Sequence, residues 1–227
     1  MSNHSLKNFF RQKPNVCPYC HVANHPRCLN MEGSKDSENN TIHVVMWRCG
    51  NEDCNRIILT QHIEDISGLK LSRFLDGTPK GPEWPKLIEE MKSGHPNDID
   101  IMKGSRFIKT YLQSLVAENM GLDELAGMGY RKSIEYLVKD WAINLYPEKR
   151  NEIFNNWLDY VIKNFFQGEL KEILLRATWL GNDQSHYNQL FQDYNIGDLK
   201  ELIDLIVVDL DREHKKKQYI ANIQKRK

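Results

Sequence analysis

Hydrophobic and polar residues follow two different periods along this chain of 227 residues. From residue 105 to the C-terminus, apolar residues recur every three to four positions, which predicts amphipathic helices. Before residue 75, two short runs rich in β-branched residues, Thr41–Arg48 and Arg56–Ile63, predict strands on either side of a turn-rich segment. The change of period divides the chain into a β module over residues 1–75 and a helical domain over residues 105–227.

Residues 76–104, between these two parts, have no clear period. They contain Pro79, Pro82, Pro85 and Pro96 together with four glycines. Such a density of proline and glycine predicts a linker, with a single helical turn around Leu87–Met91.

Five apolar stripes predict five helices in the last part of the chain, and several residues indicate where these helices begin or end. Asp123 is placed to cap the second helix, Pro147 suits the first position of the third, Gly168 ends the third, and Asp198 with Glu201 resembles a capping box for the last. The stripes cover Phe107–Val116, Leu125–Leu145, Ile153–Phe165, Leu170–Ala177 and Leu202–Leu210. Antiparallel packing with short loops then gives a helical bundle. The predicted fold is mainly α, with a small N-terminal zinc-ribbon-like β module.

The charge balance excludes some classes of partner. With 31 basic and 31 acidic residues the net charge is zero, which rules out wholesale attraction to nucleic acid or to membranes. No apolar run reaches the roughly 18 residues of a membrane span, and the N-terminus lacks the apolar core of a secretion signal. We therefore expect a cytoplasmic protein that does not bind membranes.

The cysteines predict a metal site. All five lie in the first 54 residues, and two close pairs stand out: Cys17 with Cys20, and Cys49 with Cys54. Two such pairs, the second between two strands, are what a tetrahedral Zn²⁺ site requires, and four thiolates close the site to substrate, so its role is structural. The polar segment Asn30–Asn40 is then interpreted as a surface loop.

Three further residues, Cys28, His21 and His25, are spare donors that can replace a member of this set. Two other interpretations stay open for the cysteines: buried thiols without a metal, or a redox pair at Cys17 and Cys20. The redox interpretation lacks a surrounding βαβ pattern.

Two polar positions interrupt the apolar pattern of the helical domain. Arg131 falls on the second apolar stripe and needs a partner, for which Glu135 is suitably placed one turn later. In the segment Leu180–His186, a turn carries Asn182, Asp183 and His186 toward the next helix. Taken singly, the first is typical of a structural ion pair and the second of an Asx-type helix start.

Taken together, these features resemble a known family. A paired-cysteine ribbon, then LAGMGYRKSIEYLVKD, then LGNDQSH is similar to the bacterial domain-of-unknown-function family 4145, which has been placed near the HEPN (higher eukaryotes and prokaryotes nucleotide-binding) helical bundles. The resemblance covers the ribbon and most of residues 105–210. It implies a HEPN-like bundle and, because members are fused to restriction-endonuclease and other defence-type proteins, a role linked to phage or mobile-element biology. It implies no defined activity.

HEPN ribonucleases carry an R-N-x-x-x-H motif, in which the histidine transfers protons and the arginine stabilises charge on the phosphate. On this chain the resemblance places the asparagine at Asn182 and the histidine at His186, whereas Gly181 stands at the arginine position. The missing cation would have to come from Arg131 or Arg176. This departure favours a protein without nuclease activity.

Two functions compete on this basis. The first is a non-catalytic binding or scaffold protein that contacts a defence-system protein, or RNA or DNA, through the ribbon and the basic C-terminus, Arg212–Lys217 and Lys225–Lys227. The second is a metal-independent endoribonuclease that uses His186, Asn182, Asp183 and a displaced arginine, with Arg131 and Glu135 as tentative site residues. The basic C-terminus is equally typical of a solvated helix end.

The last long helix also predicts self-association. It carries Leu205, Val207 and Val208 beyond a single core stripe, and such surplus apolar surface suits a two-fold homodimer through the helical domain.

Overall fold

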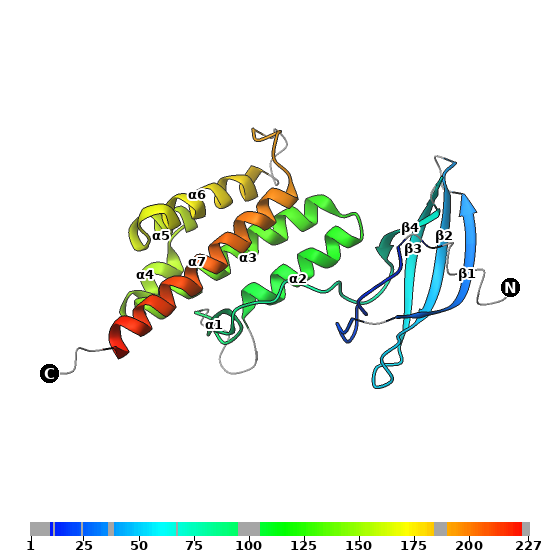
Figure 1. Cartoon of the computed structure of the whole chain (residues 1–227). Coiled ribbons are helices and arrows are strands. Elements are labelled where there is room, and N and C mark those ends of the chain that lie inside the picture. Colours follow the sequence, from blue (N-terminus) through cyan, green and yellow to red (C-terminus); the bar gives the residue numbers. More distant parts are fainter. Residues whose placement is uncertain are drawn as a thin grey trace. The chain divides into compact units, whose positions relative to one another are not determined.

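The chain was studied as a computed structural model, which describes residue 10 and residues 12–23, 25–35, 39–66, 68–94, 105–183 and 190–223. It divides into two compact units, Met1–Gly81 with Glu118–Gly121 and Pro82–Ala117 with Leu122–Lys227. The first unit holds a sheet and the second holds the helices (Figure 1). Within the described residues, no helix combines the length and the apolar character needed to cross a membrane.

The sheet of the first unit is a four-stranded antiparallel meander, in which each strand pairs with the next along the chain. Its strands are β1 (Arg27–Lys35), β2 (Thr41–Arg48), β3 (Ile57–Asp65) and β4 (Gly68–Phe74). β2 matches the first predicted strand, and β3 lies within two residues of the second. β1 and β4 were not predicted.

The interpretation of Asn30–Asn40 as a surface loop is wrong as far as Lys35, because β1 occupies these positions. β1 is an edge strand whose residues Glu32–Lys35 are all exposed. It therefore lacks the alternation of apolar and polar residues by which strands are recognised, and its pairing with β2 forms it instead.

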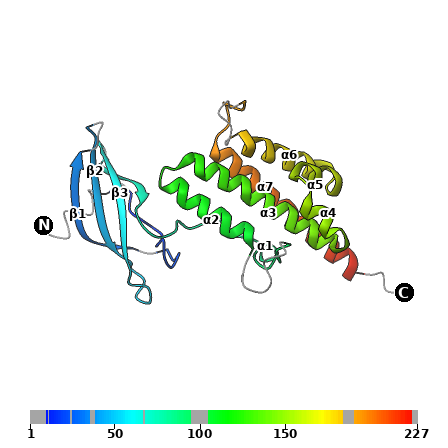
Figure 2. The same ribbon diagram turned by 180° about the vertical axis from the view of Figure 1, so that it is seen from behind.

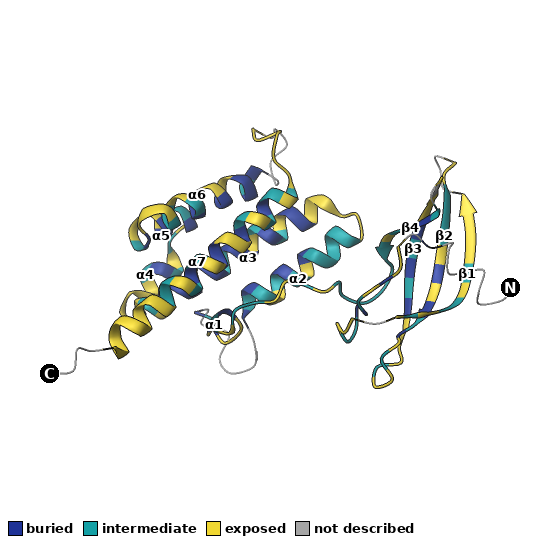
Figure 3. Cartoon of the chain, in the orientation of Figure 1, coloured by how far each residue is buried: buried dark blue, intermediate teal, exposed yellow. Residues whose placement is uncertain are grey.

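One face of the sheet carries the core of the first unit (Figure 3). Alternation along β2 turns Val45 and Trp47 to this face, and alternation along β3 turns Ile58 and His62 to it. The indole Nε1 of Trp47 donates a hydrogen bond of 2.7 Å to Thr60 Oγ1, so the buried ring leaves no N–H unsatisfied. The core also includes Phe10, Leu69, Cys17 and Cys49.

The second unit is built around one long central helix, α3, which packs against α4, α5, α6 and α7 (Figures 1 and 2). The helices are α1 (Lys86–Glu89), α2 (Arg106–Asn119), α3 (Asp123–Leu145), α4 (Arg150–Asn155), α5 (Leu158–Phe165), α6 (Gly168–Asp183) and α7 (Ile196–Asn222), with a 3₁₀ turn, η2 (Pro147–Lys149), before α4. The mainly helical fold after an N-terminal sheet is confirmed.

The predicted linker contributes to the helical core. Ile88 and Met91 near its middle are buried, and the ring of Trp84 lies edge-on to Phe107 and Tyr111. The helical unit therefore starts near Pro82, about twenty residues before the predicted boundary at residue 105.

The third predicted helix is interrupted. Asn156 and Trp157 have extended backbone between α4 and α5, and the Trp157 side chain is 87% exposed although the pattern placed it in the core. The amide of Asn156 donates a hydrogen bond to the Glu152 carbonyl and so satisfies an acceptor at the end of α4. Apolar periodicity cannot register this break, because the stripe continues across it.

Helix ends differ from their predicted positions by a few residues. Asp123 is the first residue of α3 and not its cap. Gly168 begins α6 with a positive φ of 62°, whereas α5 already ends at Phe165. The capping box of α7 consists of Asn195 and Asp198. Of these helices, α7 has a side-chain cap, whereas Leu122 at the N-cap of α3 offers none.

Candidate metal centre and a polar cluster

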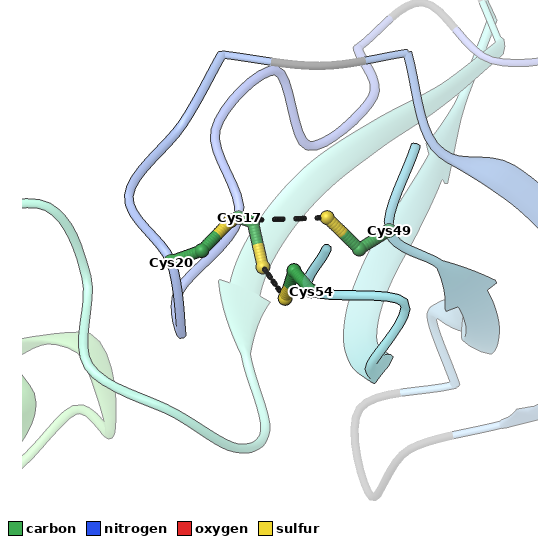
Figure 4. Close-up of side chains that lie close together, drawn as sticks. All are labelled: Cys17, Cys20, Cys49 and Cys54. Carbon is green, nitrogen blue, oxygen red and sulfur yellow. Dashed lines mark hydrogen bonds between the residues drawn. The ribbon is translucent and has the colours of Figure 1, made fainter. Parts of the chain in front are cut away.

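Four cysteines of the first unit bring their sulfur atoms together (Figure 4). All four Sγ atoms lie within 4.8 Å of one another, with 3.8 Å between those of Cys17 and Cys54 and 3.9 Å between those of Cys20 and Cys49. These separations exceed a disulfide bond of about 2.05 Å, and all four cysteines are free thiols. The cluster can hold a metal ion.

Each cysteine pair lies in a tight turn that directs its sulfurs inward. His21 and Asn55 follow the second cysteine of each pair and have positive φ angles of 55° and 46°. This left-handed conformation reverses the chain directly after the ligand. Backbone hydrogen bonds close the turns, from His21 N to Cys17 O and from Cys54 N to Asn51 O.

The sulfurs differ in their surroundings. Burial raises the pKa of Cys17, and it raises the pKa of Cys49 to about 12. The pKa of Cys20 is lowered to about 7, chiefly by a hydrogen bond from the backbone N–H of Val22. Four thiolates held this closely repel one another, so a bound cation is the natural charge balance for the deprotonated set.

The three spare donors do not belong to this group. His21 directs its Nε2 to the carbonyl of Thr78 at 3.2 Å, and Cys28 lies on β1 with its Sγ near Asn30 O. His25 is exposed. Among the described residues, the set that could hold a metal consists of Cys17, Cys20, Cys49 and Cys54.

In the second unit, the structure brings together three of the residues that the sequence singled out in the helical domain. Arg131 Nε donates a hydrogen bond of 2.5 Å to Asn182 Oδ1, and Arg131 Nη1 lies 3.4 Å from Glu135 Oε2. The side chains of Arg131 and Glu135 are 25% and 23% exposed, so the pair is half-buried. Asn182 lies in the last turn of α6 and not in the predicted turn after it.

The apolar stripe that placed Arg131 in the helix interior is shifted in the structure. Met128 is 44% exposed, and the buried face of α3 runs instead through Tyr130, Ile134 and Leu137. Arg131 therefore lies at the border of this face, where its guanidinium reaches both α6 and Glu135.

Glu135 is surrounded by cations that sequence reasoning did not include. Lys132 Nζ lies 3.0 Å from Glu135 Oε2, and Lys139 Nζ lies 3.2 Å from Oε1. Burial raises the pKa of Glu135, but the hydrogen bonds and charges of both lysines outweigh it, so the pKa ends below its ordinary value. The i,i+3 and i,i+4 spacings of the two lysines were visible in the sequence. The cluster borders a cavity of about 200 Å³, also lined by Tyr136 and Asp140.

Gly181 leaves room for this arrangement. A Cβ atom built on Gly181 would lie 2.7 Å from Arg131 Cγ and 2.9 Å from Arg131 Cβ. Any larger residue at position 181 would displace the arginine stem. The glycine that departs from the HEPN pattern therefore lies directly against an arginine from another helix.

Other residues of the nuclease hypothesis lie elsewhere. His186 is outside the described residues. Asp183 is buried, and its two carboxylate oxygens accept hydrogen bonds from the backbone N–H groups of Leu190 and Phe191, which is a structural role. Arg176 pairs with Glu172 at 2.7 Å on the exposed side of α6.

The described part of the basic C-terminus is largely paired with acids. Along α7, Lys215 Nζ lies 2.5 Å from Asp211 Oδ2, and Lys216 Nζ lies 2.8 Å from Glu213 Oε1. Arg212 Nη1 lies 3.9 Å from Asp209 Oδ1. Lys225–Lys227 lie outside the described residues. Two of these acids, Asp209 and Asp211, precede the basic segment and offset its charge. The prediction counted charges from residue 212 onward and therefore did not include them.

Only part of the surplus apolar surface predicted on the last helix is exposed. Leu205 and Val208 are 53% and 59% exposed, whereas Val207 is 3% exposed and belongs to the core. The homodimer stays a prediction.

Comparisons with known proteins gave no match, whether to a family model, to a curated protein or to a solved structure.

Proposed function

We propose that this chain is a non-catalytic binding or scaffold protein whose sheet unit is stabilised by one structural Zn²⁺. The observation that carries the proposal is the convergence of four cysteine sulfurs within 4.8 Å of one another. A tetrahedral zinc with Zn–S distances of about 2.3 Å requires sulfurs about 3.8 Å apart. The separations of 3.8 and 3.9 Å fit this requirement.

The donor set also determines the role that the ion can have. Four thiolates fill the tetrahedral positions and leave none for water or substrate, so the ion supplies folding energy and no catalysis. Here it would tie the turn before β1 to the turn between β2 and β3, whose cysteines are 29 or more positions apart.

Elemental analysis of purified protein tests the metal. We expect one equivalent of zinc per chain in wild type and in Cys28→Ser, and a strong loss in Cys17→Ser. Cys28 is the matched control because it is also a half-buried free cysteine of the same unit. Less than about half an equivalent in wild type, or loss of metal in Cys28→Ser, contradicts the proposed site.

For the partner, we propose RNA or DNA, or a defence-system protein, in accordance with the family resemblance. Nucleic acid would be contacted through the ribbon and the basic C-terminus. Because most described cations of this segment are paired along α7, the contact would rest mainly on Lys225–Lys227. Binding should then weaken steeply with salt and decrease when residues 224–227 are deleted. Unchanged binding after this deletion contradicts the tail contact.

A second function is supported by a specific observation. The hydrogen bond from Arg131 to Asn182 places a guanidinium beside the asparagine that matches the HEPN motif. An arginine from α3 thus lies beside one residue of the motif and is the candidate for the displaced cation that phosphate stabilisation requires. Against this function, Arg131 already shares its charge with Glu135, which reduces its attraction for a phosphate.

A further inference from the structure

The face of the sheet opposite the core carries an apolar stripe. Along β2 and β3, the residues that point away from the core are apolar at six of eight positions. Exposed and buried positions alternate along β2 (Figure 3). Four of them are more than a third exposed: Val44 at 40%, Met46 at 37%, Ile57 at 36% and Ile63 at 42%. The other two, Ile42 and Leu59, are partly exposed. Contiguous apolar surface of this kind on a sheet marks an interaction face.

Strand register arranges this face in rows that cross the sheet. One row runs from Glu32 on β1 through Val44 and Gln61 to Arg73 on β4. The next row consists of Ser34, Ile42, Ile63 and Lys70, and a third begins with Asn30, Met46 and Leu59. The apolar residues thus lie on the two central strands, where Gln61 and Arg48 are the polar exceptions, and polar residues lie on the two edges.

In the row from Glu32 to Arg73, the two edges carry opposite charges. The β1 edge contributes exposed Glu32 and the β4 edge contributes Arg73, with exposed Lys70 in the next row. Arg73 Nε donates a hydrogen bond to Gln61 Oε1, which keeps its side chain along the outward row. This row, with an acid at one end and a base at the other, complements the same row of a second copy turned by 180°. Arg27 and Arg48 lie in another row, which ends at Ile57.

We propose that this sheet face binds a second copy of the chain in a two-fold, face-to-face dimer. A two-fold axis parallel to the strands, between β2 and β3, places each row opposite the same row of the second copy, with the order of the strands reversed. It sets Glu32 against Arg73 of the partner subunit, Ile42 against Ile63 of the partner subunit, and Met46 against Leu59 of the partner subunit. An axis across the strands would oppose like-charged edges instead. Aligned face-to-face packing of this kind is common between sheets.

The size of the face sets the expected affinity. Four strands about 4.8 Å apart and rows about 6.8 Å apart give a face of roughly 500 Å², or about 1,000 Å² over two copies. This area is near the lower limit for a specific interface, so we expect dissociation constants on the order of micromolar. The inference does not depend on nucleic-acid binding or on the partner proposed above.

Light scattering and sedimentation of the metal-loaded full chain test the proposal. The protein concentration is varied over about 1–100 μM, a range that brackets the expected dissociation constant. Met46→Lys places a charge in the centre of the face, at a position already exposed, and should give a monomer with unchanged helix content. Leu205→Lys is the matched variant on the exposed face of α7, which is the competing dimer interface predicted from the sequence, and it should leave the sheet-face dimer intact. Wild type that stays monomeric, or a dimer lost in Leu205→Lys but kept in Met46→Lys, overturns the proposal.

A charge exchange tests the orientation of the two copies. Glu32→Lys alone places like charges on opposing edges and should raise the dissociation constant about tenfold or more. Adding Arg73→Glu in the same chain restores an acid facing a base in the same row and should recover most of the affinity. If the double variant dimerises no better than Glu32→Lys, the axis along the strands is wrong.

Discussion

Arg131 on α3 donates a hydrogen bond of 2.5 Å from Nε to Oδ1 of Asn182 on α6, although 51 positions separate them in the chain. The residue beside the acceptor, Gly181, allows this contact because it has no side chain to meet the arginine stem. The bond joins two helices that both pack in the core of the helical unit.

The glycine should have a background-dependent effect on stability. Gly181→Ala places a Cβ atom 2.7 Å from Arg131 Cγ, so we expect the free energy of unfolding to fall by about 1–3 kcal/mol. In an Arg131→Ala background the contact with Cγ is gone, but the Cβ of residue 131 still lies 2.9 Å from the added Cβ, so the same change should destabilise the protein by less than in wild type, because the helix propensity of alanine offsets part of the cost. Urea unfolding of the four proteins measures both effects. Equal effects in the two backgrounds contradict the contact.

Arg131 should contribute more to the free energy of unfolding than an exposed arginine that also pairs with a glutamate four positions away. Arg131→Ala leaves Asn182 and half-buried Glu135 with fewer partners, and we expect a loss of about 1–3 kcal/mol, below the roughly 3–5 kcal/mol for a fully buried pair. Arg176→Ala removes an exposed i,i+4 pair with Glu172 and should cost less than about 0.5 kcal/mol. A similar fall in melting temperature for the two variants argues against the cluster.

Metal removal should affect one unit before the other. The two units have separate hydrophobic cores, and the four cysteines belong to the core of the sheet unit. A strong chelator should therefore lower the melting temperature of the sheet unit, while helical circular dichroism at 222 nm persists to higher temperature. A single transition that shifts as a whole with chelator contradicts this independence.

His62 should make the sheet unit sensitive to acid. Burial, with a smaller contribution from the charge of His43, lowers the pKa of His62 to about 4. An unfolded histidine titrates near 6.5, so below that pH the unfolded chain binds a proton that native His62 does not. The stabilisation is complete above about pH 6.5 and is lost as pH falls toward 4. The total loss in the free energy of unfolding is on the order of 3 kcal/mol.

His62→Gln isolates this contribution. The neutral amide can still pair with Thr60 Oγ1, which lies 3.0 Å from His62 Nε2, but it does not titrate. Metal release in acid affects wild type and variant alike, so the difference between their unfolding free energies should change in favour of the variant as pH falls from 7 to 5. A difference that is constant with pH contradicts the lowered pKa.

Ribonuclease activity should be weak or absent. Gly181 stands at the arginine position of the motif, and loss of one transition-state donor typically reduces the rate by about 10²–10³. We expect no robust cleavage of a mixed RNA pool in EDTA. Cleavage that disappears in His186→Ala and in Arg131→Ala, with folding intact, would instead support the nuclease with a displaced arginine.

Local features of the sequence determined much of this protein. Ligands within a turn are three to five positions apart, so the pairs Cys17 with Cys20 and Cys49 with Cys54 could be recognised without the fold. Helical periodicity identified α2 and α3 because each buries one continuous face. The i,i+4 spacing of Arg131 and Glu135 likewise predicted their contact.

Tertiary structure decided what depends on a distant partner. β1 exists because β2 offers it hydrogen bonds, and its exposed side chains give no periodic signal. The break at Trp157 and the position of Asn182 inside α6 follow from packing, not from the apolar pattern. The row from Glu32 to Arg73 requires the register of four strands, and register is set by pairings between strands, which no single segment contains.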